Sequence, residues 1–255
     1  MRAQYERLKG HLAELKLNTA LVNLDFVLEQ AMKDQISPTE TLERLLSLEV
    51  HRRFEKRVET NYRLSGLPVR KRLEDFDFEA QPGVPKAAIQ ELSTLRFVNH
   101  GENVLLIGSC GVGKTHLAIG LALKAIEAGH RVGFVTAHAL VSKVRQAHQR
   151  QRLDRLLTNF LRADILILDE LGFLPFDQTE ANFLFELVNT RYQKQKPMII
   201  TSNKVFSQWE KMFPDRVMAV ALLDRLLHHG HALQIQGESY RLKHRRDAGL
   251  TPQNT

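Results

Sequence analysis

The sequence predicts an α/β P-loop fold with a central parallel sheet, preceded by a small all-helical domain. Three observations support this prediction. Residues 1–66 carry only helical patterns, strand and helix patterns alternate after residue 100, and a glycine-rich phosphate-binding motif directly follows the first strand. Buried apolar strands separated by crossover helices are typical of a parallel sheet that is covered on both faces.

The N-terminal part, residues 1–66, is expected to be a helical domain. Leucines recur there at near-helical spacing in two successive stripes. A third helix is predicted to begin at Ser37, which can cap its N-terminus, and at Pro38, which suits the first helical position. Gly66 and Pro68 are expected to end this helix.

Residues 67–100 are predicted to form a linker, because proline, glycine and an Asp-Phe-Asp-Phe segment replace the periodic patterns there. Residues 101–255 are predicted to form the nucleotide-binding domain. Its strands are expected at residues 103–107, 131–136, 164–168, 197–202 and 231–236.

The composition favours a soluble globular protein, with 43% apolar and 25% charged residues among 255. The apolar runs are far shorter than the ~20 residues of a membrane span, so no membrane partner is expected. The N-terminus lacks a signal-peptide core. A single cysteine, Cys110, excludes an internal disulfide framework and fits a reducing compartment. We therefore expect a cytoplasmic protein.

A phosphate-binding loop is predicted between the first strand and the helix that follows it. Its residues match G-x-x-x-x-G-K-[ST] and are Gly108, Ser109, Cys110, Gly111, Val112, Gly113, Lys114 and Thr115. The glycines let backbone N–H groups converge on phosphates at a helix N-terminus. Lys114 supplies a charge to the β- and γ-phosphates, and the Thr115 hydroxyl is placed to bind Mg²⁺. The predicted cofactors are ATP and Mg²⁺, and His116 is included in the nucleotide site.

Polar residues at the ends of two later strands are predicted to complete the site. An apolar run over 165–168 is followed by Asp169 and Glu170, at the strand end where open α/β sheets bind ligands. Asp169 is expected to hold Mg²⁺, and Glu170 to polarise the attacking water. Asn203 follows another buried strand and is positioned either to reach the γ-phosphate or to cap the next helix.

Several segments together resemble the IstB-like insertion-sequence ATPases. They are GENVLLIG (101–108), GKTHLA (113–118), DELG (169–172), TSN (201–203), LLDRLLHH (222–229) and GESYRL (237–242). The similarity also includes 73–78 and 81–83 and so covers nearly the whole chain. Proteins of this kind are AAA+ ATPases of the initiator and helicase-loader branch, close to DnaC, and they assist a partner transposase.

The resemblance assigns further roles and partners. Asn203 matches a sensor-1 residue, Arg225 an arginine finger that completes a neighbouring subunit's site, and Arg241 a sensor-2 arginine. It implies a homo-oligomer with shared ATP sites, double-stranded DNA and a cognate transposase as partners. Cys110 and the segment 214–216 depart from the usual pattern at variable positions. Without the family, Arg225 would be interpreted as a surface arginine paired with Asp224 or Asp215.

Two basic clusters on a chain of net charge +7 suggest contact with DNA phosphates. The first consists of Lys143, Arg145, Arg150, Arg152, Arg155 and Arg162. The second consists of Arg52, Arg53, Lys56, Arg57, Arg63, Arg70, Lys71 and Arg72. A solvated helix face is the alternative for any one of these residues. Eleven histidines are present, but the spacing of those at 228, 229 and 231 is not that of helical zinc ligands, so no structural metal is expected.

The leading hypothesis is a switch in which ATP drives self-assembly on DNA, the assembly recruits the transposase, and hydrolysis releases it. A helicase loader acting on single-stranded DNA is the alternative, and a non-hydrolysing architectural protein is a third class. A kinase is disfavoured because Glu170 directly follows the metal carboxylate and no lid-like acceptor site is evident.

Overall fold

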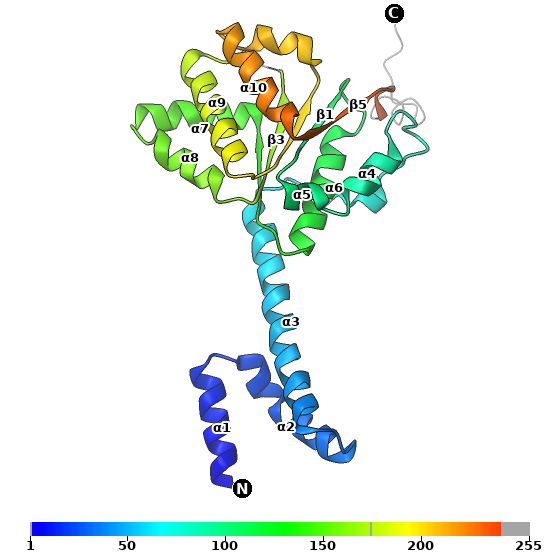
Figure 1. Ribbon diagram of the computed structural model, residues 1–255, viewed down its shortest axis with the longest axis vertical. Helices are drawn as coiled ribbons and strands as arrows, with labels where there is room; N and C mark the ends of the chain where they lie inside the picture. The colour runs from blue at the N-terminus through cyan, green and yellow to red at the C-terminus, as the bar shows by residue number, and fades with distance from the viewer. Residues whose placement is uncertain (1, 174, 241–255) are drawn as a thin grey trace, which may run out of the picture. The chain divides into compact units, whose positions relative to one another are not determined.

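The computed structural model of the chain describes residues 2–173 and 175–240 (Figure 1). It divides into two compact units, Met1–Thr60 and Asn61–Thr255. The boundary lies within one helix, α3 (Pro38–Ser65), which begins and ends as predicted. Ser37 Oγ accepts the N–H of Glu40 at 3.2 Å at the start of this helix. None of the described helices is long and apolar enough to cross a membrane.

The N-terminal unit contains α1 (Arg2–Glu14), α2 (Asn18–Lys33) and most of α3. Its small core consists of Leu12, Ala20, Leu24, Val27 and Leu45.

A buried carboxylate on α3 fixes the start of α2. Glu49 Oε2 accepts the backbone N–H groups of Thr19 at 2.7 Å and Ala20 at 3.2 Å, which lack partners within their own helix. Arg53 donates to the other carboxylate oxygen at 2.8 Å. Burial raises the pKa of Glu49, but Arg53 and the two N–H groups lower it by more, so its pKa lies below the ordinary value.

The second unit is built on a five-stranded parallel sheet in the order β2-β3-β4-β1-β5. The strands are β1 (Asn103–Gly108), β2 (Val132–Thr136), β3 (Ile165–Leu171), β4 (Met198–Ser202) and β5 (Gly230–Ile235). All five predicted strands are confirmed, with ends within three residues of the prediction.

Helices cover both faces of this sheet (Figure 1). One face carries η1 (Leu73–Asp75), α4 (Lys86–Leu92), α5 (Arg96–His100) and α6 (Lys114–Glu127). The other carries α7 (Ala137–Gln149), α8 (Leu153–Leu161), α9 (Gln178–Gln193), η2 (Phe206–Met212) and α10 (Arg216–His228). From β1 the chain runs through α6 to β2 at one edge of the sheet, and the connections through α7 to α10 then lead back strand by strand toward β5 at the other edge. Because both sets of connections are right-handed crossovers, α6 and the helices α7 to α10 lie on opposite faces.

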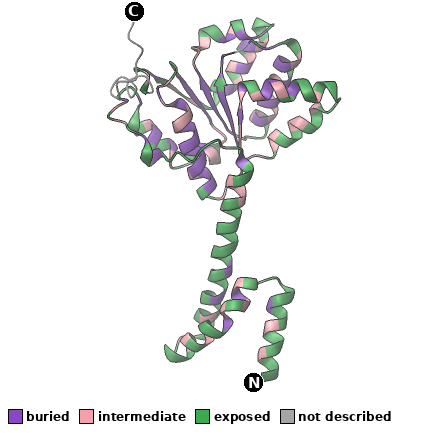
Figure 2. Ribbon diagram, turned by 180° about the vertical axis from the view of Figure 1, so that it is seen from behind, coloured by how far each residue is buried: buried purple, intermediate pink, exposed green. Residues whose placement is uncertain are grey.

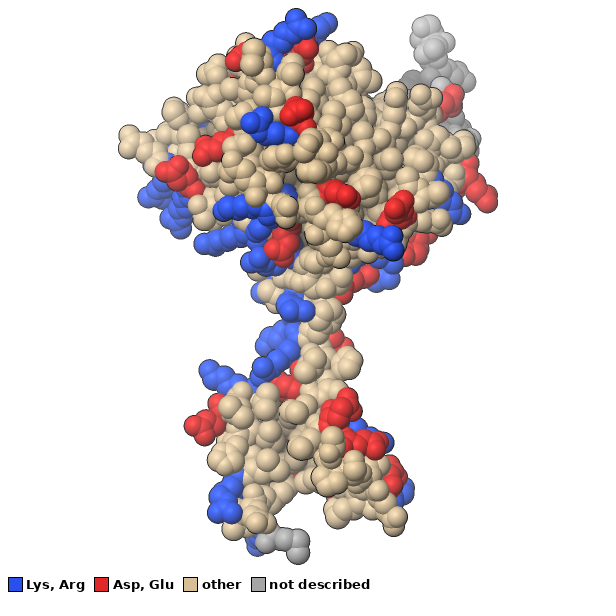
Figure 3. Space-filling view, viewed as in Figure 1, with Lys and Arg blue, Asp and Glu red and all other residues tan. Residues whose placement is uncertain are grey.

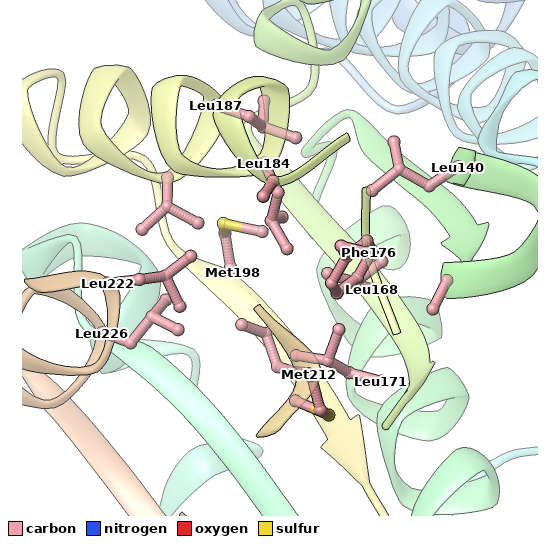
Figure 4. Close-up of a cluster of buried hydrophobic side chains, with 14 of the residues drawn as sticks. Leu140, Leu168, Leu171, Phe176, Leu184, Leu187, Met198, Met212, Leu222 and Leu226 are labelled. Carbon is pink, nitrogen blue, oxygen red and sulfur yellow. The ribbon is translucent and has the colours of Figure 1, made fainter. Parts of the chain in front are cut away.

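Buried residues concentrate in the strands and in the helices that pack against them (Figure 2). Figure 4 shows the cluster between the sheet and the helices α7, α9 and α10. Leu168 and Met198 from the strands pack there with Leu184 of α9 and Leu222 of α10. The apolar runs that predicted the inner strands β1, β3 and β4 are therefore buried, as a sheet covered on both faces requires.

The segment 67–100, expected to be a linker, packs as part of the second unit. Leu73, Phe76 and Phe97 are buried. Leu73 lies so close to α6 that a Cβ atom on Gly120 would be 2.6 Å from its Cδ2 atom. The helices of this segment contain seven residues or fewer, too few for a helical period to be visible in the sequence.

Arg191 of α9 ties the end of α8 to the beginnings of β3 and β4. Its guanidinium donates to the carbonyls of Phe160 at 3.0 Å and Ala163 at 3.2 Å. It also donates to those of Asp164 at 3.0 Å and Pro197 at 2.8 Å. Burial lowers the pKa of Arg191 to about 10, which still leaves the side chain charged at neutral pH.

Candidate active site

The phosphate-binding loop connects the end of β1 to the first residue of α6. Gly111 and Gly113 have φ angles of 83° and 97°, in the left-handed region that glycine enters without a steric penalty. The Lys114 ammonium turns back over the loop and donates to the carbonyls of Gly108 at 2.7 Å and Ser109 at 2.6 Å. The loop thus presents a helix N-terminus and a lysine at one place, which is the arrangement that binds phosphate.

A hydroxyl and carboxylate network joins this loop to two strands. Thr115 Oγ1 lies 2.9 Å from Asp169 Oδ1 and 3.2 Å from Oδ2. Thr201, at the end of β4, donates to Asp169 Oδ1 at 2.6 Å and accepts the N–H of Glu170 at 2.9 Å. Asp169 and Thr201 are both buried.

Thr201 was missed as a site residue by the sequence analysis. A polar side chain near the end of an apolar strand could have indicated a site residue. The sequence does not show, however, which strand lies beside this one in the sheet. Because β4 lies directly beside β3, Thr201 contacts both carboxylate residues through one hydroxyl.

Glu170 has a φ angle of 61°, unusual for a residue with a side chain. The strand pairing between β3 and β4 is irregular between Leu168 and Leu171, which accommodates this turn of the backbone. A left-handed backbone costs a residue other than glycine roughly 1–2 kcal/mol. Its effect here is to expose the Glu170 side chain on a cavity, while Asp169 stays buried.

That cavity, of about 510 Å³, brings most of the predicted site residues together. The predicted residues that line it are Cys110, Gly111, Gly113, Lys114, Thr115, His116, Glu170 and Asn203. Asn203 lies against Gly172, where a Cβ atom would be 2.8 Å from Asn203 Oδ1. His116 Nε2 lies 2.8 Å from the carbonyl of Arg72, and its ring packs against Phe76.

The end of β5 and the chain after it pass closely over the phosphate-binding loop. A Cβ atom on Gly108 would lie 2.2 Å from the Ile235 carbonyl oxygen, and one on Gly111 would lie 2.1 Å from Ser239 Oγ. The N–H of Tyr240 donates to the Gly111 carbonyl at 3.0 Å. Glycine is therefore required in this loop for close packing as well as for backbone conformation. The predicted sensor residue Arg241 lies outside the described residues.

Arg225 does not line this cavity. It lies in the last turn of α10, on the face of the sheet opposite to α6 (Figure 1). Its Nε donates to Asn189 Oδ1 at 2.9 Å, and its guanidinium carbon lies 4.9 Å from the centre of the Phe185 ring. The side chain is therefore held on α9 instead of being paired with Asp224 or Asp215, the alternative that the sequence left open.

Five of the six residues of the first basic cluster divide into two groups, and the sixth, Arg162, is exposed. Lys143, Arg150, Arg152 and Arg155 line a shallow hollow of about 240 Å³ between α7 and α8. Figure 3 shows lysine and arginine side chains gathered over this side of the unit. Arg145 instead points toward α9, where it donates to the buried carboxylate of Glu180 at 2.6 Å. Its predicted role in DNA contact is therefore less well supported than that of the other four.

The second basic cluster is partly paired on its own helix. Arg52 lies 3.3 Å from Glu55, and Arg53 lies 2.8 Å from Glu49. Arg57 lies over the Phe54 ring at 5.1 Å. Lys56, on the same part of α3, is exposed. These contacts favour a solvated helix face more than those of the first cluster do.

The fold and the site together define an ATPase of the AAA+ class. A phosphate-binding loop follows β1, carboxylates end β3, and polar residues end the intervening strand β4. The chain belongs to the family described as IstB-like ATP binding protein, whose sequence profile matches residues 10–248.

Relatives from several bacteria are similar over almost their whole length. An ATP-binding protein of insertion sequence IS21 from Pseudomonas aeruginosa is 46% identical over 244 residues, which is 96% of this chain and 92% of that protein. The corresponding protein of insertion sequence IS5376 from Geobacillus stearothermophilus is 41% identical over 241 residues, or 94% of this chain and 96% of that protein.

Solved structures share the fold at lower identity. DnaA from Aquifex aeolicus bound to AMPPCP superposes with a TM-score of 0.56 at 21% identity, covering 74% of this chain and 58% of that chain. The DnaC helicase loader gives a TM-score of 0.52 at 20% identity, covering 59% of this chain and 87% of that chain.

Proposed function

We propose that ATP binding drives self-assembly of this ATPase on double-stranded DNA, and that the assembly recruits the transposase of an insertion sequence. Hydrolysis of ATP to ADP and phosphate then ends the assembled state. The observation that carries the binding and hydrolysis of ATP in this proposal is the contact of Thr115 with Asp169 beside the exposed carboxylate of Glu170. The naming of the relatives after insertion sequences supports the transposase as partner, and the single cysteine supports a cytoplasmic location.

The residues at the loop fit a magnesium nucleotide. The Thr115 hydroxyl and the Asp169 carboxylate offer adjacent oxygen ligands, the type that Mg²⁺ prefers. Bound there, Mg²⁺ would neutralise phosphate charge. Lys114 then stabilises the β- and γ-phosphates, and Glu170 accepts a proton from the attacking water. Asn203, at the end of β4, orients that water or the γ-phosphate.

Replacing Glu170 by glutamine tests the hydrolytic part of this proposal. ATP affinity should change little, whereas turnover should fall at least about 100-fold, the usual lower bound for loss of a general base. Assemblies on duplex DNA should then persist longer, because bound ATP is not consumed. Glu186→Gln, on an exposed position of α9, is the matched control. Parental turnover in the Glu170 variant would exclude it as the water-activating group.

Arg225 supports an ATP site that is shared between subunits. Its guanidinium lies away from the cavity of its own chain, and a positive charge from a neighbour would stabilise the transferred phosphoryl group. A contact between two different surfaces repeats into a ring or a helical filament. We therefore assign Arg225 to the active site of an adjacent subunit.

Mixing two inactive variants tests this assignment. Arg225→Ala keeps an intact phosphate-binding loop, and Lys114→Ala keeps an intact finger, so mixed interfaces should regain ATPase activity that neither variant shows alone. Arg216→Ala, which replaces an exposed arginine of the same helix, should retain full activity by itself. If the two variants co-assemble without recovery, Arg225 does not act across the interface.

The hollow between α7 and α8 is the proposed DNA contact. Four cations with no buried carboxylate among the lining residues would bind mainly phosphates, so binding should depend weakly on sequence and strongly on salt. A helicase loader is the second candidate function, and the DnaC helicase loader shares the fold of this chain. Binding to duplex and single-stranded DNA of equal length separates the two, since a loader should prefer the single strand.

A further inference from the structure

The N-terminal unit, Met1–Thr60, leaves much of its apolar surface uncovered. Among its described residues, five apolar side chains are buried in the core, whereas ten large apolar side chains are exposed. In the described part of the second unit, which is much longer, eight are exposed. Exposed apolar surface that is concentrated in a small unit marks an interaction surface.

A unit of this length needs more than its own core to be stable. Domains below roughly 70–80 residues generally add disulfides, a bound metal or a partner subunit to a small core. The single cysteine of the chain, Cys110, lies outside this unit. The described residues contain no group of His, Cys, Asp and Glu that could hold a metal ion. A partner subunit is therefore the remaining means of stabilisation.

Four of the exposed apolar side chains form one row on α3. Leu42, Leu46, Val50 and Phe54 recur every four residues and are between 38% and 65% exposed. Figure 2 shows this helix mostly in the colour of exposed residues. Side chains at i and i+4 form a ridge that packs into the groove beside a ridge of another helix. The row extends over about 18 Å and so offers another helix a continuous apolar ridge.

The charges along α3 fit an antiparallel second copy of the same helix. Residues 38–48 carry two acids and one base, whereas residues 49–58 carry four bases and two acids. Two parallel copies would place like charges side by side. Two antiparallel copies bring the acidic half of each helix to the basic half of the other, which is electrostatically complementary. The row is centred between Leu46 and Val50, so an antiparallel pair places Leu42 near Phe54 of the partner subunit.

We propose that this row is a dimer interface, at which α3 packs antiparallel on α3 of a second copy of the chain. The contact is isologous, because both subunits use the same surface. It involves neither the nucleotide cavity nor Arg225, so it requires no ATP and is independent of the proposed head-to-tail contact. It also gives four residues of the second basic cluster a role other than DNA contact, as the complement of the partner's acidic half. These residues are Arg52, Arg53, Lys56 and Arg57.

Sedimentation velocity of the full chain without nucleotide tests this contact. EDTA is included so that no magnesium nucleotide supports head-to-tail assembly. The parental chain should sediment as a dimer that dissociates on dilution. Val50→Glu places a charge from each copy at the centre of the interface, so the dimer dissociation constant should rise at least about 100-fold. Leu46→Gln, which adds no charge, should raise the dissociation constant by a smaller factor.

Val22→Glu is the matched control, because Val22 is an exposed valine of α2 in the same unit. This variant should dimerise like the parent. The proposal is overturned if the parental chain stays monomeric up to about 100 μM, or if Val50→Glu dimerises as tightly as the parent. Loss of the dimer in the Val22 variant but not in the Val50 variant would place the contact on α2 and would also overturn it.

Chemical cross-linking tests the antiparallel orientation. Leu42→Cys and Phe54→Cys are each introduced into a chain that also carries Cys110→Ser. A short bismaleimide should join the two different variants when they are mixed. It should join neither variant to itself, because the two copies of residue 42 are separated by about the 18 Å length of the row. Cross-linking of each variant to itself would show a parallel pair, and a dimer without any cross-link would place the contact outside the row.

Discussion

Replacing Thr201 by valine should remove the two hydrogen bonds by which β4 holds the Asp169 carboxylate and the backbone of Glu170. The Thr201 hydroxyl donates to Asp169 Oδ1 at 2.6 Å and accepts the N–H of Glu170 at 2.9 Å. Valine has nearly the same shape but no hydroxyl. The substitution therefore removes one donor from a buried carboxylate and leaves one backbone N–H without its acceptor.

The magnitude follows from these two contacts. A hydrogen bond to a charged group contributes about 1.5–3 kcal/mol, and a buried N–H left unpaired costs about 1–3 kcal/mol. The added methyl group recovers about 0.8 kcal/mol by burial. We expect a net loss of about 3 kcal/mol, which lowers the Tm of a domain of this size by about 6–12 °C. Turnover should fall more than ATP affinity, because the lost bond holds the left-handed backbone of Glu170.

Thermal unfolding followed by circular dichroism, together with ATP affinity and steady-state turnover, measures these effects. Thr201→Ser keeps the hydroxyl and should retain most of the activity. Thr158→Val is the matched control, because that exposed hydroxyl donates only to the carbonyl of Asp154 in its own helix. A Thr201→Val protein that unfolds within about 2 °C of the parent and turns over ATP at the same rate would refute the supporting role of Thr201.

Three further predictions concern other parts of the chain. Arg191→Met should lower the free energy of unfolding in urea by about 3–5 kcal/mol, because four carbonyls lose their donor; a loss below about 1 kcal/mol would contradict this. The pKa of Glu49 lies below its ordinary value, so its contribution is complete above the unfolded pKa and is lost as pH falls through the folded one. Glu49→Gln should therefore destabilise the helical unit at neutral pH and flatten its acid unfolding curve. Replacing Arg150, Arg152 and Arg155 by glutamine should reduce the salt slope of duplex binding by up to about 2.7 in log–log units, whereas an unchanged slope would place the DNA elsewhere.

The sequence by itself determined the strands, the start of α3 and the phosphate-binding loop. The inner strands β1, β3 and β4 follow from apolar runs, because burial on both faces of a sheet requires continuous apolar segments. The start of α3 follows from Ser37 and Pro38, whose preferences act within one turn of helix. The phosphate-binding loop follows from the spacing of its glycines around Lys114. These features depend on local interactions, which a single sequence displays directly.

The tertiary structure decided which of these elements meet. The position of β4 beside β3 brings Thr201 to Asp169, 32 residues away in the chain, and the packing after β5 brings Glu238 to Gln81, 157 residues away. Hydrophobic periodicity specifies which face of an element is buried but not its lateral neighbour, so neither contact was predictable.

Side-chain direction within the basic segment was also decided by packing. Arg145 and Arg150 have the same charge and lie five positions apart, yet Arg145 pairs with Glu180 on α9 and Arg150 lines the hollow beside α8. In the same way, Arg225 was predicted from its motif, but only the packing of α10 on α9 placed it on Asn189 and away from its own nucleotide cavity. Sequence supplies the charge at each position, whereas the neighbouring helix determines whether that charge is bound within the chain or presented to a partner.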